Sequence, residues 1–316
     1  MKVLITGITG FAGSYLSDYL LKQNKFEVSG TYLDDKSLAN LENKDDIKLY
    51  KVNLLDEEAT AKLVQYEKPD YLFHLAALTS AKKSFSDPKE TFVNNISAQI
   101  NVLEAIKILG LIGTKVLIIS SAEVYGRVSK EDLPIDEETS FHPTNPYAVS
   151  KLTQDFMGLQ YYLTNKLKIV RVRPFNHVGP KQSPQFVVSA FAKRIVEMEK
   201  GKEKTMKVGN LSSRRDFTDV RDMVKAYLLA LEKGVDGEVY NLGSGKSYEI
   251  SEILNMMIDL SKTQIQTEQD PSLIMPSDDP ELLCDFSKFE KLTGWRPEIP
   301  IEKTLRDTLD YWRNQV

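Results

Sequence analysis

A glycine-rich segment near the N-terminus constrains the fold of this 316-residue chain more than any other part of the sequence. Residues 3–6 form a short apolar run, which predicts a strand buried on both faces of a sheet. Gly7, Gly10 and Gly13 follow with the spacing G-x-x-G-x-x-G and lead into a segment with helical periodicity. Glycine permits close approach of a diphosphate, whose charge the helix N-terminus stabilises. The segment therefore predicts a dinucleotide site; the alternative is a glycine-rich turn that binds no ligand.

Strand and helix signals alternate along the first half of the chain. Asp87-Pro88 predicts a capped helix running to about residue 109, and Asn145-Pro146 predicts another running to about residue 163. Further apolar runs predict strands at residues 26–32, 47–52, 71–75, 116–119 and 169–173. This alternation predicts an α/β fold with a Rossmann-type, doubly wound parallel sheet. The carboxyl ends of its strands meet at one edge, where ligands bind.

The alternation of strand and helix signals becomes less regular after residue 173, which bears on domain organisation. We expect an NAD(P)-binding Rossmann domain at residues 1–173 and a smaller mixed α/β substrate-binding lobe that makes up most of residues 174–316. A strand and helix within about residues 212–245 are expected to return to the sheet. Strand-like pieces lie at residues 206–208 and 239–242, and helices are predicted near residues 186–200, 220–233, 250–261, 287–293 and 301–314.

The composition excludes several classes of protein. The 41 Lys and Arg residues against 45 Asp and Glu residues give a net charge of −4, which argues against binding nucleic acid through a general basic field. Cys284 is the single cysteine, and His74, His142 and His177 are widely separated, so no metal site is expected. No run approaches the ~18 apolar residues of a membrane span. The first residues lack a cationic, cleavable leader pattern, and we expect a cytoplasmic protein without membrane contact.

The end of the second predicted strand bears on the choice between NAD and NADP. In many dinucleotide-binding folds an acid here binds the ribose 2′-hydroxyl, whereas an Arg accepts a 2′-phosphate. Asp34 and Asp35 follow this strand, and no Arg accompanies them. The segment favours NAD, although two adjacent acids are equally typical of a charged surface.

Tyr147 and Lys151 lie four residues apart on a predicted helix and so share one face. An ammonium beside a phenol favours the phenolate and lowers the pKa of the tyrosine. An exposed pair at this spacing is the alternative. Ser121 follows the strand predicted at residues 116–119, which places a hydroxyl at the edge where a cofactor would lie.

Together these motifs resemble those of the extended short-chain dehydrogenase/reductase family. The matches are T-G-x-x-G-x-x-G at residues 6–13, H-L-A-A at 74–77, a Ser before V-Y-G at 121–126, and Y-x-x-x-K. The resemblance implies that Ser121 is the catalytic hydroxyl, Tyr147 the general acid/base, and Lys151 its pKa tuner and ribose anchor. It implies an NAD(P)H site formed by Gly7, Thr9, Gly10, Phe11, Ala12, Gly13, Asp34, Asn53, Leu54, Leu75, Ala76, Ala77, Tyr147, Lys151 and Pro174.

Two later segments resemble the sugar-nucleotide-modifying branch of this family. Residues 173–180 are similar to its R-x-x-N-x-x-G-P loop, and residues 215–220 to its R-D-F-x-x-V segment. The resemblance implies that the planar guanidinium of Arg215 meets the nucleotide phosphates. The alternative for Arg215 is a buried ion pair with Asp219 or Asp222. The implied substrate residues are Thr79, Ser80, Glu123, Asn176, Phe186, Val187, Lys193, Val208 and Arg215, with Arg194 as another candidate cation.

Within that branch, residues 175–183 are similar to the F-N-H-x-G-P-x-Q-S run of the GDP-4-dehydro-6-deoxy-D-mannose reductases. This resemblance implies NAD(P)H-dependent reduction of the C4 ketone of GDP-4-keto-6-deoxy-D-mannose to GDP-D-rhamnose. One departure is Met275-Pro276-Ser277, where Arg-Pro-Ser would be expected, so one diphosphate contact is missing. The resemblance also implies a homodimer formed through residues 98–109 and the helix that carries Tyr147.

Three other functions stay open. A 4,6-dehydratase needs an additional base and acid. Glu123 stands where GDP-mannose dehydratases carry a glutamate, but its neighbour Ala122 cannot transfer a proton. Glu123 would serve equally as a ligand for a substrate hydroxyl in a reductase. A 4-epimerase would use the same Ser, Tyr and Lys. A non-catalytic dinucleotide sensor usually lacks the Tyr or the Lys, and both are present here.

Overall fold

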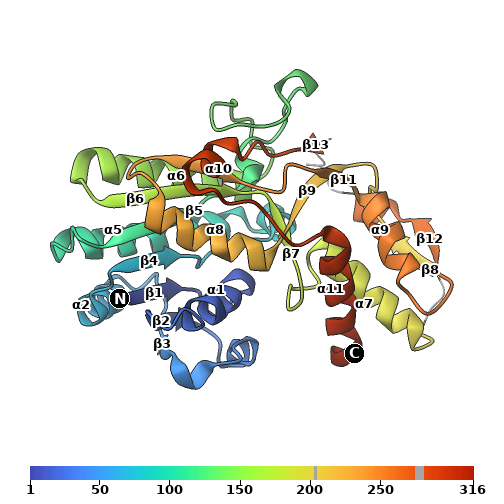
Figure 1. Cartoon of the computed structure of the whole chain (residues 1–316), viewed down its shortest axis with the longest axis horizontal. Helices are drawn as coiled ribbons and strands as arrows, with labels where there is room; N and C mark the ends of the chain where they lie inside the picture. The colour runs from blue at the N-terminus through green and yellow to red at the C-terminus, as the bar shows by residue number, and fades with distance from the viewer. Residues whose placement is uncertain (203–204, 275–280) are drawn as a thin grey trace.

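The computed structural model describes residues 1–202, 205–274 and 281–316. Its main sheet is parallel throughout and has seven strands in the order β10-β6-β5-β4-β1-β2-β3 (Figure 1). This confirms the Rossmann-type sheet. The strands are β1 (Lys2–Thr6), β2 (Glu27–Tyr32), β3 (Lys48–Lys51), β4 (Tyr71–His74), β5 (Lys115–Ile119), β6 (Lys168–Pro174) and β10 (Val239–Leu242).

Helices cover both faces of this sheet because its central strands are apolar on both sides. In β1, Val3 and Ile5 join the core under α1 (Phe11–Leu21) and α8 (Val220–Lys233). Leu4 points to the opposite face, where the core is completed by α2 (Glu57–Glu67), α5 (Ala98–Ile108) and α6 (Pro146–Asn165). Neither α2 nor the short α3 (Ala81–Ser86) was predicted from the sequence.

The helix predicted from Asp87 to about residue 109 is not regular. Asp87 caps it as expected, because its carboxylate accepts a hydrogen bond from the Glu90 amide at 2.9 Å. After α4 (Pro88–Phe92) the backbone forms a π-helical turn, η3 (Val93–Ser97), before continuing as α5. The turn places the side chain of Asn95 in the interior. Such π-helical turns occur frequently at functional sites.

A smaller lobe lies beside the carboxyl edge of the main sheet, on the right in Figure 1. Its core is formed by α7 (Val187–Glu199), α9 (Ile250–Asp259) and α11 (Ile301–Gln315), together with β8 (Thr205–Val208), which pairs with β12 (Gln266–Gln269). A second small sheet joins β9 (Arg214–Asp219) to β7 (Asn176–Val178), β11 (Ser247–Glu249) and β13 (Glu281–Leu282). Of these strands, only β8 was predicted from the sequence.

The chain returns to the main sheet after entering the smaller lobe. β10 pairs with β6 as the edge strand, and α8 packs beside α1 on one face. α10 (Ser287–Thr293) lies against β10 and has the bounds predicted from the sequence. The chain therefore passes between the main sheet and the smaller lobe more than once. A domain division at residue 173 stays a prediction.

A buried ion cluster fixes α6 to β6. The carboxylate of Asp155 is fully buried and accepts hydrogen bonds from Arg171 at 2.5 Å and Arg173 at 2.8 Å. Arg171 also donates to the Gly237 carbonyl, and Arg173 to the hydroxyl of Tyr125 at 2.9 Å. Because buried charges need partners, this cluster holds α6 in one position on the sheet.

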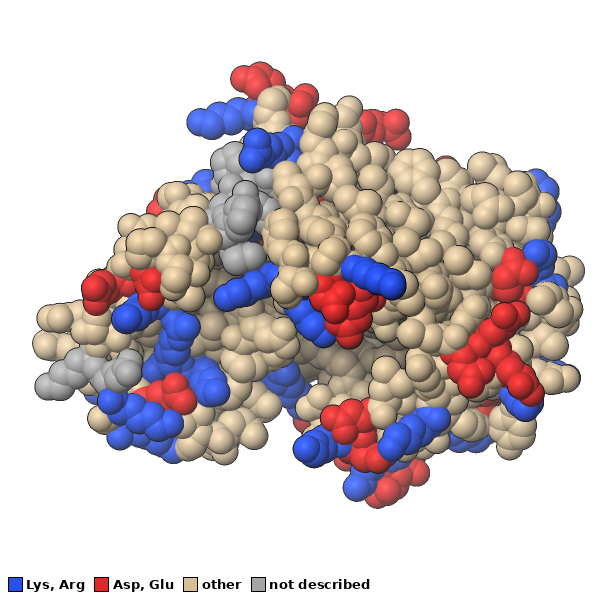
Figure 2. Space-filling view, turned by 180° about the vertical axis from the view of Figure 1, so that it is seen from behind, with Lys and Arg blue, Asp and Glu red and all other residues tan. Residues whose placement is uncertain are grey.

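Charged side chains of both signs are interspersed over the face seen in Figure 2, as expected for a chain of small net charge. Within the described ranges, no helix combines the length and apolar character needed to cross a lipid bilayer.

Candidate functional site

The loop between β1 and α1 has the shape of a phosphate cradle. Gly7 has a φ of +68°, and a Cβ there would lie 2.9 Å from the Cα of Ala76. A Cβ on Gly13 would lie 2.5 Å from the Gly7 carbonyl oxygen, so the close packing of this loop requires glycine. Gly10 is the N-cap of α1 and has no side chain with which to accept from the first turn. The amides of that turn are therefore directed at the position an anion would occupy.

A cavity of about 310 Å³ opens beside this loop, at the carboxyl ends of β1 to β4. The predicted cofactor residues that line it are Gly7, Thr9, Gly10, Asp34, Asn53, Leu54, Leu75, Ala76 and Ala77. The sequence did not indicate Thr31, Tyr32, Leu33, Ser37, Val52, Leu55, Leu78, Asn94 and Ala98, which also line it. The predicted residues Phe11, Ala12, Gly13, Tyr147, Lys151 and Pro174 lie outside its lining. A glycine cradle that opens into this cavity fits a dinucleotide.

Of the two acids after β2, only Asp34 faces this cavity. Its carboxylate accepts a hydrogen bond from the Lys36 amide at 3.0 Å and caps the 3-10 helix η1 (Asp35–Asn40). The carboxylate of Asp35 forms an ion pair with Lys51 and does not line the cavity. Asp35 therefore matches the surface-charge alternative, and Asp34 occupies the position expected for a ribose ligand.

The start of α6 sets the direction of the Tyr-Lys pair. The Asn145 side chain accepts a hydrogen bond from the Ala148 amide at 2.8 Å, and Pro146 occupies the first turn. This is the cap and proline combination that the sequence indicated. It places Tyr147 and Lys151 on one face of the helix, where both side chains are buried rather than exposed.

Two further predicted residues lie against Tyr147. Ser121 follows β5, and its hydroxyl forms a hydrogen bond with the tyrosine side chain. The carboxylate of Glu123 accepts a hydrogen bond from the Asn145 side chain at 2.9 Å and faces the phenol. The structure thus brings Ser121, Glu123, Tyr147 and Lys151 together, next to the carboxyl end of the sheet.

The direction of the Tyr147 pKa differs from the expectation that Lys151 lowers it. Burial raises the pKa of Tyr147, the negative charge of Glu123 raises it further, and the hydrogen bond with Ser121 opposes both. Burial also lowers the pKa of Lys151 to about 7, while Asp155 opposes that shift. The Lys151 ammonium donates to the Gln154 side chain at 2.6 Å. Tyr147 is consequently protonated at neutral pH, as a general acid must be.

His74 anchors the loop on the nicotinamide side of the expected cofactor position. Its Nδ1 lies 3.0 Å from the Thr6 hydroxyl, which also accepts a hydrogen bond from the Ala76 amide. Burial lowers the pKa of His74 to about 3, and the nearby charge of Lys151 acts in the same direction. The imidazole is therefore neutral and connects the ends of β1 and β4.

Arg215 lies on β9 and donates to the Arg214 carbonyl at 2.8 Å. The two acids considered as its alternative partners are paired elsewhere. Asp219 accepts from Arg221 at 2.7 Å, and Asp222 accepts from Lys225 at 3.0 Å. The departure noted at residues 275–277 lies outside the described residues.

The remaining predicted substrate residues lie on several different elements. Thr79 precedes Ser80, which caps α3; Asn176 begins β7, Phe186 and Val187 begin α7, and Val208 ends β8. The Lys193 side chain is directed towards α11, where its ammonium lies 5.7 Å from the centre of the Trp312 ring.

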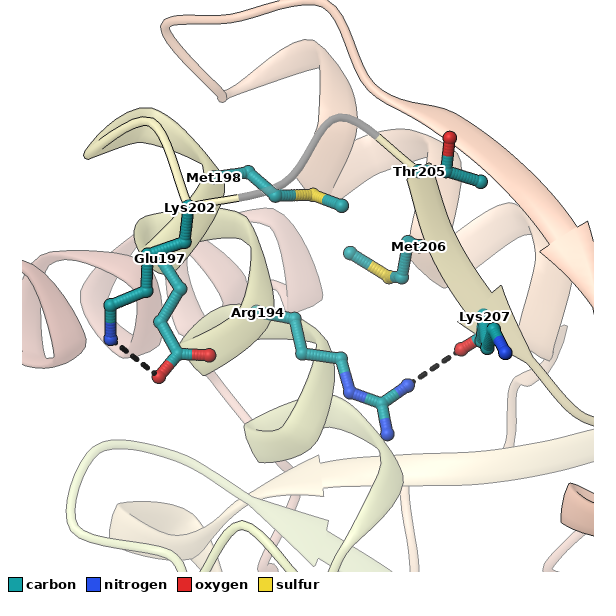
Figure 3. A pocket seen from close by; sticks show the side chains of 7 residues that line it. All are labelled: Arg194, Glu197, Met198, Lys202, Thr205, Met206 and Lys207. Atoms are coloured by element: carbon teal, nitrogen blue, oxygen red, sulfur yellow. Dashed lines mark hydrogen bonds and ion pairs between the residues drawn. The ribbon is translucent and has the colours of Figure 1, made fainter.

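Arg194 lies on the β8 side of α7 and donates to the Lys207 carbonyl at 2.6 Å (Figure 3). It borders a cavity of about 330 Å³ lined by Arg194, Glu197, Met198, Lys202, Thr205, Met206 and Lys207. The Arg194 side chain therefore lies beside β8, whereas that of Lys193 lies beside α11.

A parallel sheet, a glycine cradle and a buried Ser-Tyr-Lys group define an NAD(P)-dependent oxidoreductase of the short-chain dehydrogenase type. The chain belongs to the GDP-mannose 4,6 dehydratase family, whose model matches residues 4–308.

Individual relatives match all or nearly all of the chain. A GDP-6-deoxy-D-mannose reductase of Pseudomonas aeruginosa is 34% identical over 316 residues, covering 100% of this chain and 98% of the relative. A GDP-mannose 4,6-dehydratase of Vibrio cholerae is 28% identical over 345 residues, covering 96% and 91%.

Solved structures agree with this assignment. RMD from Pseudomonas aeruginosa complexed with NADPH has a TM-score of 0.86 at 33% identity, covering 100% of this chain and 99% of that one. UDP-glucose 4-epimerase of Thermus thermophilus in complex with NAD has a TM-score of 0.88 at 28% identity, covering 100% of both. Both relatives bind a nicotinamide dinucleotide, the cofactor class that the sequence predicted.

Proposed function

We propose that this protein uses NAD(P)H to reduce the C4 ketone of GDP-4-keto-6-deoxy-D-mannose, forming GDP-D-rhamnose. The observation that carries the proposal is the buried Ser121–Tyr147 pair, in which burial and Glu123 keep Tyr147 protonated. A ketone reductase needs such a proton donor where negative charge develops. The match to the Pseudomonas aeruginosa GDP-6-deoxy-D-mannose reductase along the full chain supports the choice of sugar nucleotide.

Each residue of the site has its own role in the proposed reaction. The reduced nicotinamide supplies a hydride when bound in the glycine-lined cavity. Tyr147 donates its proton to the C4 oxygen, and the Ser121 hydroxyl donates a hydrogen bond to the same oxygen, stabilising the developing alkoxide. Lys151 supplies a positive charge one helical turn from the phenol. Arg215 holds the diphosphate of the sugar nucleotide with its planar guanidinium.

The dehydratase alternative is less well supported by the residues around Tyr147. Dehydration at C6 requires an acid that protonates the leaving hydroxyl, in addition to a base at C5. Glu123 is the candidate base, but its carboxylate is held by Asn145, and its buried neighbour Ala122 has no group that can transfer a proton. The reductase needs no group beyond those already present.

Asp34 favours NADH over NADPH in this proposal. The carboxylate lies on the cavity wall and would bind the ribose hydroxyls, whereas a 2′-phosphate would place like charges together. The Pseudomonas aeruginosa structure holds NADPH, and comparing initial rates with NADH and NADPH tests the preference of this chain.

The deciding experiment combines purified protein with GDP-4-keto-6-deoxymannose and, separately, NADH or NADPH, while nicotinamide absorbance is recorded. Oxidation of either cofactor, with GDP-D-rhamnose identified as the product, is the expected result. Absence of oxidation with both cofactors would overturn the reductase proposal. Conversion of GDP-mannose without added reductant would establish the dehydratase instead.

We also propose that the protein forms a homodimer through α5 and α6. Exposed apolar side chains recur every seven residues on α6, at Val149, Phe156 and Leu163, and Ile100 is exposed on the adjacent α5. A seven-residue spacing places such side chains in one stripe. Such a stripe, beside an exposed apolar side chain on the neighbouring helix, suits packing against a second copy.

Replacing Phe156 with Glu is expected to convert this dimer to a monomer, because the carboxylate would be buried in an apolar interface. Sedimentation equilibrium at micromolar concentration measures the change. Tyr66→Glu is the matched control, since Tyr66 is the more exposed ring and lies on α2. A monomeric wild-type protein, or a dimeric Phe156→Glu variant, would contradict the proposed interface.

A further inference from the structure

Within the described part of the chain, Gln154 is the one side chain that accepts a hydrogen bond from the Lys151 ammonium. Its Oε1 lies 2.6 Å from the Lys151 Nζ. Its Nε2 donates to the backbone carbonyl of Asn95 at 2.8 Å. The backbone carbonyl of Gln154 accepts from the side chain of Gln99, also at 2.8 Å. Gln154 is fully buried. Because its amide nitrogen is engaged by a carbonyl, its oxygen must point at Lys151.

The hydrogen bond from Gln154 to Asn95 leads into the π-helical turn. The Asn95 side chain accepts from the Leu78 amide at 2.8 Å and donates to the Leu78 carbonyl at 3.1 Å. It also donates to the Ser150 hydroxyl at 2.9 Å. Leu78 lines the cofactor cavity, so Gln154 links Lys151 through Asn95 to the wall of that cavity.

We infer that Gln154 is a positioning residue, which holds the Lys151 ammonium in a fixed place between Tyr147 and the cofactor loop. This inference rests on the proposed catalytic role of Lys151. A lysine side chain has several rotatable bonds, and a short, oriented acceptor reduces the conformations open to it. A neutral amide does so without adding a charge to the site.

The groups around Lys151 show why an uncharged acceptor matters. Asp155 lies one turn further along α6, but its carboxylate is engaged by two arginines. His74, at the end of β4, is neutral, and the Tyr147 phenol is protonated. Burial disfavours the ammonium form of Lys151, and the negative charge of Asp155 opposes this effect. The hydrogen bond with Gln154 also favours the ammonium form and, unlike Asp155, contacts the nitrogen directly.

Two substitutions test the inference in opposite directions. Gln154→Leu removes the acceptor at nearly constant volume, and the pKa of Lys151 should fall by about one to two pH units. Gln154→Glu retains an acceptor and adds negative charge, so the pKa of Lys151 should rise. Gln99→Leu is the control, because Gln99 is equally buried and contacts Gln154 without contacting Lys151.

The readouts are NMR titration of ¹³Cε-labelled lysine, with the signal assigned by Lys151→Met, and the pH dependence of kcat for ketone reduction. The loss of kcat at high pH should move to lower pH in Gln154→Leu and to higher pH in Gln154→Glu. An unchanged Lys151 pKa in both variants would overturn the inference, and thermal unfolding identifies variants that fail to fold. The NMR titration needs no substrate, so failure of the reductase proposal would be seen separately, as absent turnover by the wild type.

Discussion

Replacing Tyr147 with Phe is expected to lower turnover by about 10²–10⁴-fold, the contribution typical of a positioned general acid. The phenol is buried, forms a hydrogen bond with Ser121 and stays protonated near neutral pH. Phe fills the same space, so cofactor affinity should stay close to that of the wild type. Initial rates with the ketone substrate and cofactor titration by fluorescence measure the two quantities separately.

Tyr227→Phe provides a closely matched control. Tyr227 lies on α8 and is fully buried, and burial and the nearby Tyr147 both raise the pKa of Tyr227. Its hydroxyl has no hydrogen-bond partner in the described structure, so its removal should cost neither stability nor turnover. Full turnover by Tyr147→Phe would show that the proton comes from another group.

Replacing Asp155 with Ala is expected to destabilise the fold by ~3–5 kcal/mol, because it leaves two buried guanidinium groups without a counter-charge. Asp155 is fully buried, and Arg171 and Arg173 both donate to it. The substitution would also release α6 from β6, and with it the helix that carries Tyr147 and Lys151. Urea unfolding followed by circular dichroism measures the free energy of unfolding.

Asp310→Ala is the corresponding surface control. Asp310 pairs with Arg313 across one helical turn of α11 and is more than half exposed. Such a pair contributes at most about 0.5 kcal/mol. A similar effect for the two substitutions would mean that the buried cluster does not hold the fold together.

The parts of the fold that could be predicted have a local signal in the sequence. The apolar runs of β1 and β5 and the caps at Asp87 and Asn145 each depend on a few neighbouring residues. β12 could not be predicted, since its four residues are polar and exposed and form a strand only by pairing with β8. The π-helical turn was missed because its sequence continues a helical pattern.

The candidate site also contains residues with a local signal in the sequence and residues without one. Ser121 and Asp34 could be predicted because they follow strands whose carboxyl ends meet at one edge. Asn94 and Gln154 reach the site through the packing of α6 against the π-helical turn, which no short motif records. The direction of the Tyr147 pKa could not be derived from the four-residue spacing, because it depends on burial and on Glu123.

The return of α8 and β10 to the main sheet has a consequence for genetic dissection of the protein. A gene fragment ending at codon 173 would encode β6 without its edge partner and without the Gly237 carbonyl that binds Arg171. It would also leave the apolar side chains of Val170 and Val172 without the cover of α8. The main sheet is therefore encoded by two separate stretches of the gene. Isolating it would require splicing two coding stretches together, with the intervening stretch replaced by a short linker.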